Sequence, residues 1–426
     1  MRYLVALVMF TLALAATFVS PPQDEVFGAV PGTEMPPVSI CPLLQAAGRS
    51  TAISVLSSIN GQGRISTFAA GAEIGSLDFR TGGSGAVTVP AADAGAVGVS
   101  GGLVEMPTET TVSGVVVSGE GSRAAEACAD IPTGQSFISG GSTASGASFE
   151  LQLLNPYAGE AVVDLTVSTE AGIESDDRFD AVIVPALSTI VLDLAQIIPG
   201  RESIAVDMQT TRGSVLGVGR QTTNGEIAIW RAVEPGQDWW LPVPAGDALK
   251  QLVISSAVSS EVEYQVDFYG PGGLVESLEA GVLSPRGQVR VDLAALTPEA
   301  SGVRVIATGP VMSTLWIDSP AGMAATTASQ VDAPTWLLPG ASLPPGGNAS
   351  IVILNTGIET ATITVRSLRE TSVTRNVEIP PEEVVVIDLV TADGYRIDAT
   401  GPVVTLWTSD LGGAGSAALG IPIQDG

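Results

Sequence analysis

Two nearly identical segments occur in the second half of this sequence. ATGPVMSTLW (Ala307–Trp316) and ATGPVVTLW (Ala399–Trp407) begin 92 residues apart (399 − 307). A second motif marks the same period, because three segments end in Asp-Leu, at Asp193, Asp292 and Asp388. Their spacings are 99 residues (292 − 193) and 96 residues (388 − 292). A period this long exceeds a solenoid repeat and matches the length of a β-sandwich domain.

Hydrophobic and polar residues alternate inside each period. In the segment YQVDFY, Tyr264, Val266 and Phe268 share one face of an extended chain, whereas Gln265 and Asp267 share the other. Alternation with a period of two is typical of a β-strand with one buried face. The 49 glycines and 28 prolines favour short strands and tight turns over long helices.

The sequence therefore predicts an all-β fold: tandem immunoglobulin-like β-sandwich domains after an N-terminal apolar helix. We expect a signal or anchor segment with an extended tether at 1–36 and a divergent sandwich with a disulfide at 37–134. Three further sandwiches are expected at 135–235, 236–333 and 334–426, so that the exported part is a string of four domains.

The tryptophans are candidates for core positions. Trp316 and Trp407 end the two repeated phrases, and we expect them to fill their cores at equivalent points. Trp239 and Trp240 begin the third predicted sandwich as Trp336 begins the fourth. This match favours core or interdomain packing over a sugar-stacking platform, with Trp240 the buried partner and Trp239 the more exposed.

The N-terminus has the features of a membrane-targeting segment. Arg2 precedes an uncharged apolar run from Tyr3 to Val19. Its length lies between a signal-peptide core and a bilayer span, so an uncleaved anchor and a signal cleaved after Ala13–Ala15 are both open. Arg2 stays inside by the positive-inside rule, which predicts an extracytoplasmic protein, membrane-anchored or secreted.

The chain contains two cysteines, Cys41 and Cys128. Two cysteines in an exported chain usually form a disulfide, and two free reactive thiols are the alternative. A disulfide here would stabilise the first sandwich.

Composition excludes several kinds of chemistry. The sequence has no histidine, which rules out a Ser-His-Asp triad, a Cys-His pair and histidine metal ligands. A net charge of −27 disfavours nucleic acid as a partner. Carboxylate chemistry, serine–lysine chemistry through Lys250 and oxygen-ligated calcium are what remain. We expect no catalytic residues, no metal and no cofactor.

The densest acidic cluster is ESDDRFD, at Glu174–Asp180. Its carboxylates could bind calcium, but the spacing does not match an EF-hand loop, and a solvated loop with Asx turns is the favoured interpretation. The aspartates of the repeated Asp-Leu motif recur once per period. We therefore expect them to accept backbone hydrogen bonds at strand ends rather than to act in catalysis.

Several motifs together resemble a known family. They are ICPLL (Ile40–Leu44), AEACADIP (Ala125–Pro132), QSFISGG (Gln135–Gly141), LQLLNPYAGEAVVDLTV (Leu151–Val167) and VPALSTIVLDL (Val184–Leu194). The chain resembles an uncharacterised family of exported actinobacterial proteins with an N-terminal membrane segment and a domain of unknown function. The resemblance implies a β-rich exported protein with paired cysteines and implies no activity.

These observations lead to a functional hypothesis. We expect a non-enzymatic extracytoplasmic cell-envelope protein, a scaffold or interaction module of tandem β-sandwiches. Its partners would be the membrane, through the N-terminal segment, and envelope proteins or glycans. The alternative is a protein that binds or processes envelope glycans. An exposed aromatic strip would favour glycan binding, and two carboxylates in a cleft would favour an enzyme.

Overall fold

The computed structural model of this protein contains strands through most of the chain that it describes. The described residues are 38–45, 48–57, 60–81, 85–106, 111–119, 122–129, 134–246, 248–270, 272–293, 301–319, 322–339, 348–368, 374–389, 394–410 and 415–423. The predicted apolar helix and tether at 1–36 lie outside them. No helix within these residues is long and apolar enough to span a membrane. The all-β prediction is confirmed.

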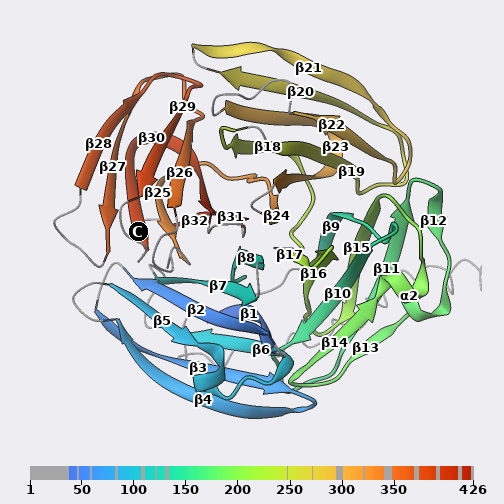
Figure 1. Cartoon of the computed structure of the whole chain (residues 1–426). Helices are drawn as coiled ribbons and strands as arrows, with labels where there is room; N and C mark the ends of the chain where they lie inside the picture. The colour runs from blue at the N-terminus through green and yellow to red at the C-terminus, as the bar shows by residue number, and fades with distance from the viewer. Residues whose placement is uncertain are drawn as a thin grey trace, which may run out of the picture. The chain divides into compact units, whose positions relative to one another are not determined.

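The strands form four sandwiches that follow one another along the chain (Figure 1). The first contains β1 (Val38–Gln45), β2 (Arg49–Ser57), β3 (Gly61–Ala69), β4 (Ala72–Thr81), β5 (Ala86–Pro90), β6 (Gly98–Glu105), β7 (Thr111–Gly119) and β8 (Ser122–Ala127). The second contains β9 (Gln135–Gly141), β10 (Ala147–Asn155), β11 (Ala161–Thr169), β12 (Gly172–Glu174), β13 (Val182–Val184), β14 (Ser188–Asp193), β15 (Ile204–Arg212), β16 (Leu216–Thr223) and β17 (Glu226–Arg231).

The last two sandwiches and the short helices complete the described elements. The third sandwich contains β18 (Gly236–Val243), β19 (Leu249–Ser256), β20 (Val262–Gly270), β21 (Gly273–Leu283), β22 (Gln288–Asp292), β23 (Ser301–Ser319) and β24 (Gly322–Thr327). The fourth contains β25 (Ala333–Leu338), β26 (Asn348–Asn355), β27 (Ala361–Ser367), β28 (Thr374–Ile379), β29 (Val384–Leu389), β30 (Tyr395–Asp410), β31 (Gly415–Leu419) and β32 (Ile421–Pro422). The helices are η1 (Ala91–Ala94), η2 (Asp177–Phe179) and α2 (Leu194–Ile197).

All four sandwiches share one strand order. The first has sheets β1-β6-β3-β4 and β5-β2-β7-β8, which match β9-β15-β11-β12 and β14-β10-β16-β17 in the second. In the third and fourth, the long strands β23 and β30 run through both sheets and replace two successive strands. The repeated sequence therefore corresponds to a repeated topology. The finer immunoglobulin-like assignment stays a prediction.

Buried asparagines fix equivalent turns in the second and fourth sandwiches. The Asn155 side chain donates hydrogen bonds to the carbonyl oxygens of Gly159, Val184 and Pro185. Asn355 makes the same three bonds, to Glu359, Ile379 and Pro380. A buried carbonyl without a partner would cost free energy, so one side chain satisfies the turn that precedes each Asp-Leu strand.

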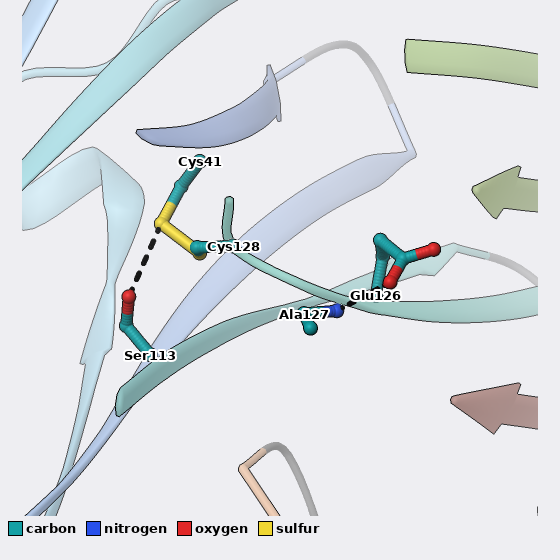
Figure 2. The surroundings of a disulfide bond; sticks show 5 residues. All are labelled: Cys41, Ser113, Glu126, Ala127 and Cys128. Carbon is teal, nitrogen blue, oxygen red and sulfur yellow. Dashed lines mark hydrogen bonds between the residues drawn. A yellow bond between two sulfur atoms is a disulfide. The ribbon is translucent and has the colours of Figure 1, made fainter. Parts of the chain in front are cut away.

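Each sandwich ends by returning to its own first strand. Isolated bridges join Ile40 to Ala129, Phe137 to Val233 and Trp240 to Ser329, and β32 pairs with β25. The predicted disulfide is present beside the first of these bridges, with the Cα atoms of Cys41 and Cys128 4.6 Å apart (Figure 2). The disulfide adds a covalent link in the first sandwich, at the point where all four sandwiches close through backbone pairing.

Four short strands near the ends of the sandwiches, called the inner strands below, pack against one another in a closed circuit. β8 contacts β17, β17 contacts β24, β24 contacts β31, and β31 contacts β8 (Figure 1). Each strand adds to a neighbouring core. Ile229 of β17 joins the core of the first sandwich, and Ala325 of β24 joins that of the second. Ala417 of β31 packs with Ala324, and Ala125 of β8 joins the core of the fourth sandwich.

The sandwiches also pack against one another, which the sequence does not predict. Residues Pro37–Gly426 form one compact unit, and hydrophobic clusters join neighbouring sandwiches, including the fourth to the first. β8, β24 and β31 carry buried alanines, whose small side chains let backbones approach closely, whereas β17 contributes Ile229 to the contact with the first sandwich. Strand pairing nevertheless stays inside each segment, and the four-domain division at the predicted boundaries stays a prediction.

A buried carboxylate lies within the circuit of inner strands. Glu126 of β8 is 6% exposed and accepts hydrogen bonds from the backbone N–H groups of Ala127 and Arg231, at 2.7 and 3.1 Å. The second bond links the first sandwich to β17. Desolvation raises the pKa of Glu126, and the Arg231 charge and the two hydrogen bonds only partly oppose it.

The raised pKa predicts a pH dependence of stability. The folded protein binds this proton more tightly than the unfolded chain, so the contribution is complete below the ordinary value of 4.5 and is lost as pH rises through the raised pKa. Glu126→Gln should therefore unfold at a similar urea concentration to wild type near pH 4 and should become relatively more stable towards pH 8. The exposed Glu359→Gln control should show no such trend, and parallel profiles for Glu126→Gln and wild type would refute the linkage.

The closed packing also predicts that the disulfide stabilises sandwiches that do not contain it. All six tryptophans lie between residues 230 and 407, outside the first sandwich, so their fluorescence reports on the other three. Replacing both Cys41 and Cys128 with Ser opens a loop with a sequence separation of 87 residues. This should lower the free energy of unfolding by about 4–5 kcal/mol in the chain-entropy model.

We expect the urea midpoint measured by tryptophan fluorescence to fall in the double variant. Wild type treated with dithiothreitol should behave like the variant, and dithiothreitol should not shift the variant further. An unchanged fluorescence transition would mean that the sandwiches unfold independently.

Candidate functional site between the second and third sandwiches

A cleft of 330 Å³ lies at the boundary between the second and third sandwiches. Its lining combines polar side chains with a single tryptophan. The lining residues are Gly140, Ser142, Ala144, Ser145, Ala147, Glu202, Gln221, Thr223, Leu249, Gln251, Arg290, Trp316, Asp318 and Met323. Its volume falls within the range of about 300–1,000 Å³ that is usual for small-molecule sites.

One face of the third sandwich supplies the aromatic wall. On β23, Trp316 and Asp318 are two residues apart and share a face. Their cross-strand partners on β19 are Gln251 and Leu249, respectively. Arg290 of β22 lies opposite Val253, which shares the face of Gln251. The strand registers therefore gather these side chains on one surface, which faces the second sandwich.

The second sandwich holds Trp316 in place. The Trp316 ring packs edge-on against Trp230, with the ring centroids 5.0 Å apart. Gly140 of β9 lies against the indole, since a Cβ at Gly140 would lie 2.3 Å from Trp316 Nε1. Gly140 also has φ +91°, a left-handed conformation that favours glycine. Trp316 nevertheless remains partly exposed, on the side that lines the cleft.

The expectation that Trp316 and Trp407 occupy equivalent core positions is wrong for Trp316. Trp407 is 1% exposed and belongs to the core of the fourth sandwich. Trp316 is the fifth residue after Val311, whereas Trp407 is the fourth after Val403. Neither strand shifts register over this span. Because strand side chains alternate, one extra residue turns the tryptophan to the opposite face.

Polar side chains at the cleft are held by defined hydrogen bonds. Arg290 donates to the Glu202 carbonyl at 2.6 Å and to Gln251 Oε1 at 3.3 Å. Burial lowers the pKa of Arg290, and the carboxylates of Glu202 and Glu170 partly oppose this effect. On the other wall, Gln221 both accepts from and donates to the backbone of Ser142, each at 2.9 Å. These bonds fix the lining side chains in position.

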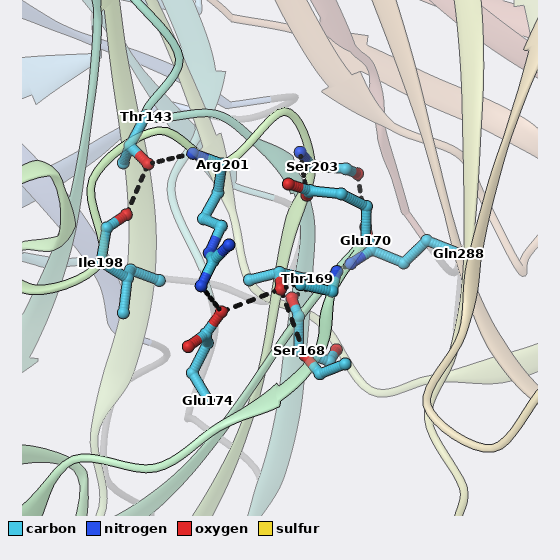
Figure 3. Close-up of polar contacts among 11 residues, drawn as sticks. Thr143, Ser168, Thr169, Glu170, Glu174, Ile198, Arg201, Ser203 and Gln288 are labelled. Atoms are coloured by element: carbon cyan, nitrogen blue, oxygen red, sulfur yellow. Dashed lines mark hydrogen bonds and ion pairs between the residues drawn. The ribbon is translucent and has the colours of Figure 1, made fainter.

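A polar network beside the cleft joins the two sandwiches (Figure 3). Gln288 of β22 accepts a hydrogen bond from Ser203 Oγ at 2.7 Å and donates to the Ser168 carbonyl at 3.1 Å. Arg286 forms a largely buried ion pair with Asp207 at 2.5 Å. Contacts from several strands therefore fix the boundary, and the cleft has rigid walls.

The predicted acidic cluster is engaged by arginines. Glu174 pairs with Arg201 at 2.7 Å (Figure 3). Asp176 caps η2 and pairs with Arg178, which lowers the pKa of that carboxyl to about 2. Within the described residues, no group of three or more acidic or cysteine side chains is placed to hold a metal ion. The Asp176 side chain accepts a hydrogen bond from the Arg178 backbone N–H, two residues on, which is an Asx turn of the kind expected for this loop.

The remaining candidate residues from the sequence take part in packing, helix capping and buried hydrogen bonds. Trp239 and Trp240 are buried, at 1% and 8% exposure, so their expected packing role is confirmed and the greater exposure expected for Trp239 is wrong. Asp193 caps α2 by accepting from the Ala195 N–H at 3.0 Å, as expected for a structural aspartate. Lys250 is fully buried and donates to the Gly246 carbonyl at 2.6 Å.

A second, larger cleft of 810 Å³ lies between the third and fourth sandwiches. Asp388, from the repeated Asp-Leu motif, lines it together with Ser350 and Thr408. Its described lining residues include neither an aromatic nor a basic side chain. Sequence reasoning did not find either cleft. The one available signal was the extra residue before Trp316, whose effect depends on a strand register that the sequence does not state.

Comparisons with known proteins identify one family model. The model described as "Family of unknown function (DUF5719)" matches residues 86–228 and 230–413. The second match begins at Trp230, inside β17, so the matches do not coincide with single sandwiches. No curated protein matches the chain.

Two solved structures have low sequence identity and low structural similarity to this chain. A Streptomyces avermitilis alpha-L-rhamnosidase is 9% identical with a TM-score of 0.13, covering 82% of this chain and 54% of its own, so this chain spans about half its length. A tetra-tandem repeat from the extending region of a large adhesion protein is 10% identical with a TM-score of 0.11, covering 90% and 99%.

The packing of Gly140 against Trp316 predicts a strong effect of a single methyl group. Gly140→Ala should lower the free energy of unfolding by about 1–3 kcal/mol from its backbone conformation, and further by displacing the indole. Gly159→Ala in the same sandwich is the matched control, because a Cβ there has no neighbour within 4 Å. Urea unfolding of both variants tests this, and equal stabilities would contradict the close approach.

Proposed function

We propose that this chain, which belongs to the DUF5719 family of unknown function, is a non-enzymatic extracytoplasmic protein of the cell envelope. In this proposal it serves as a scaffold or interaction module. Its single compact unit of four sandwiches is the observation that carries the proposal. An immunoglobulin-like character of the sandwiches is part of the same proposal and is supported by their paired antiparallel sheets.

Two features support a location outside the cytoplasm. The apolar segment from Tyr3 to Val19 follows Arg2, an arrangement that directs the rest of the chain across a membrane. The Cys41–Cys128 disulfide is of a kind that persists mainly in oxidising compartments. Together they favour a chain that folds after export and stays at the membrane or is released.

The state of the reactive side chains supports a non-enzymatic role. Without histidine, carboxylates and Lys250 are the common general bases that remain, and Lys250 is fully buried. Several acidic residues pair with arginines, among them Glu174 and Asp207. Glu202 and Asp318 are exposed carboxylates that line the same cleft, and they are the groups an enzymatic alternative would have to use.

The closed packing supports a scaffold. Inter-sandwich contacts made of buried alanines, ion pairs and hydrogen bonds restrict movement between the sandwiches. A rigid body presents its loops and sheet edges at fixed positions, which suits binding to several envelope components at once.

Export is testable in a bacterial host with the full chain and a C-terminal epitope tag. In spheroplasts, external protease should remove the tag while a cytoplasmic marker survives, and Cys41 and Cys128 should be oxidised. The matched variant Val8→Asp, which places a charge in the apolar segment, should keep the tag protected and the thiols reduced. A protected tag with reduced cysteines in the wild-type chain would overturn the proposed location.

A further inference from the structure

We infer that the cleft between the second and third sandwiches binds a neutral carbohydrate, with Trp316 as the stacking surface and Arg290 and Asp318 as hydroxyl-binding groups. The inference rests on the proposed function only for the source of the sugar, an envelope glycan. Binding itself follows from the cleft and does not depend on where the protein is located.

The aromatic wall is the first support. Trp316 is partly exposed in a cleft rather than buried in a core, and it is rigidly placed by Trp230 and Gly140. Leu249, which is 43% exposed, lies on the same face of the sheet. A flat apolar ring in a polar cleft suits the C–H face of a sugar, whose edges carry hydroxyl groups.

The polar groups around this wall complement sugar hydroxyls. Arg290 brings donors, Asp318 brings acceptors, and Gln251 brings both. Gln251 lies directly across the strand pair from Trp316, and Asp318 lies two residues along β23. Planar groups around a stacking ring can each contact neighbouring hydroxyls, and the Arg290 bonds to Gln251 and to the Glu202 carbonyl hold two of them in place before a ligand arrives.

Size and charge define the ligand more closely. A volume of 330 Å³ is at the lower end of the usual range, which fits one or two sugar rings and not a folded partner. Glu202 and Asp318 are exposed at the cleft, and the chain carries a net charge of −27. The field would repel an acidic or phosphorylated glycan, so we assign a neutral sugar.

The second cleft provides a comparison within the same molecule. It is larger, yet its described lining has hydroxyl groups and Asp388 without an aromatic ring or a basic side chain. The inference therefore assigns binding to the Trp316 cleft alone. A variant in the second cleft serves as the matched control.

Binding is measured by titrating the full chain, kept in a sugar-free detergent, with neutral oligosaccharides of the common hexoses and pentoses. Tryptophan fluorescence and calorimetry give the affinity, and a glucuronic-acid disaccharide is the charged comparison. We expect saturable binding of at least one neutral sugar and weaker binding of the acidic one. Trp316→Ala should weaken binding roughly tenfold or more, as expected for loss of an aromatic anchor.

Two further variants keep the test decisive if Trp316→Ala destabilises the fold. Asp318→Asn changes an exposed side chain and should weaken binding several-fold with an unchanged urea midpoint. Ser350→Ala, in the second cleft, should leave the affinity unchanged. The inference is overturned if no neutral sugar binds, if Asp318→Asn binds like wild type, or if the acidic disaccharide binds as well as its neutral counterparts.

Failure of this inference and failure of the proposed function give different results. Cleavage of a bound neutral sugar would contradict the non-enzymatic role while supporting the site. A cytoplasmic location would contradict the envelope role and leave the measured affinity intact. Absence of sugar binding in an exported, disulfide-bonded chain would remove the site alone.

Discussion

The inner strands of the four sandwiches pack closely on one another, and the boundaries between the sandwiches follow from this packing. β8, β17, β24 and β31 meet in a closed circuit, and small buried alanines such as Ala324 and Ala417 occupy the contact between β24 and β31. Larger side chains would hold these backbones apart. Each strand then adds apolar surface to a neighbouring core, as Ile229 does for the first sandwich and Ala325 for the second. Four modules that could have been independent thus become one unit.

The contacts among the inner strands determine which faces of neighbouring sandwiches meet. Once β24 packs on the second sandwich, the outer face of its partner β23 must also meet that sandwich. Trp316 on that face contacts Trp230, while Gln288 and Arg286 make polar contacts with the second sandwich. The cleft is the space left where polar groups and a partly exposed indole line the boundary. The packing of β24 on the second sandwich therefore places the side chains that line this cleft.

Much of the fold follows from local patterns. Alternation in β20 predicts a strand correctly, because the period of two is a property of the strand alone. The equivalent spacing of the Asp-Leu motifs marks a topology that all four sandwiches share. The order of burial of Trp239 and Trp240 does not follow from local patterns. Trp239 is inserted in the core of the third sandwich, whereas Trp240 packs against Arg304 and Tyr269 and belongs to the hydrophobic cluster of the fourth.

Periodicity, spacing and cysteine number are local properties of the chain, so the strands, the repeat of about a hundred residues and the candidate pair Cys41 and Cys128 can be read from the sequence alone. The closing of the sandwiches on one another, and the position of Trp316 in a cleft while Trp407 fills a core, are visible only in three dimensions. One extra residue reverses the face of a strand side chain, and segments far away in the sequence set the surroundings of that face.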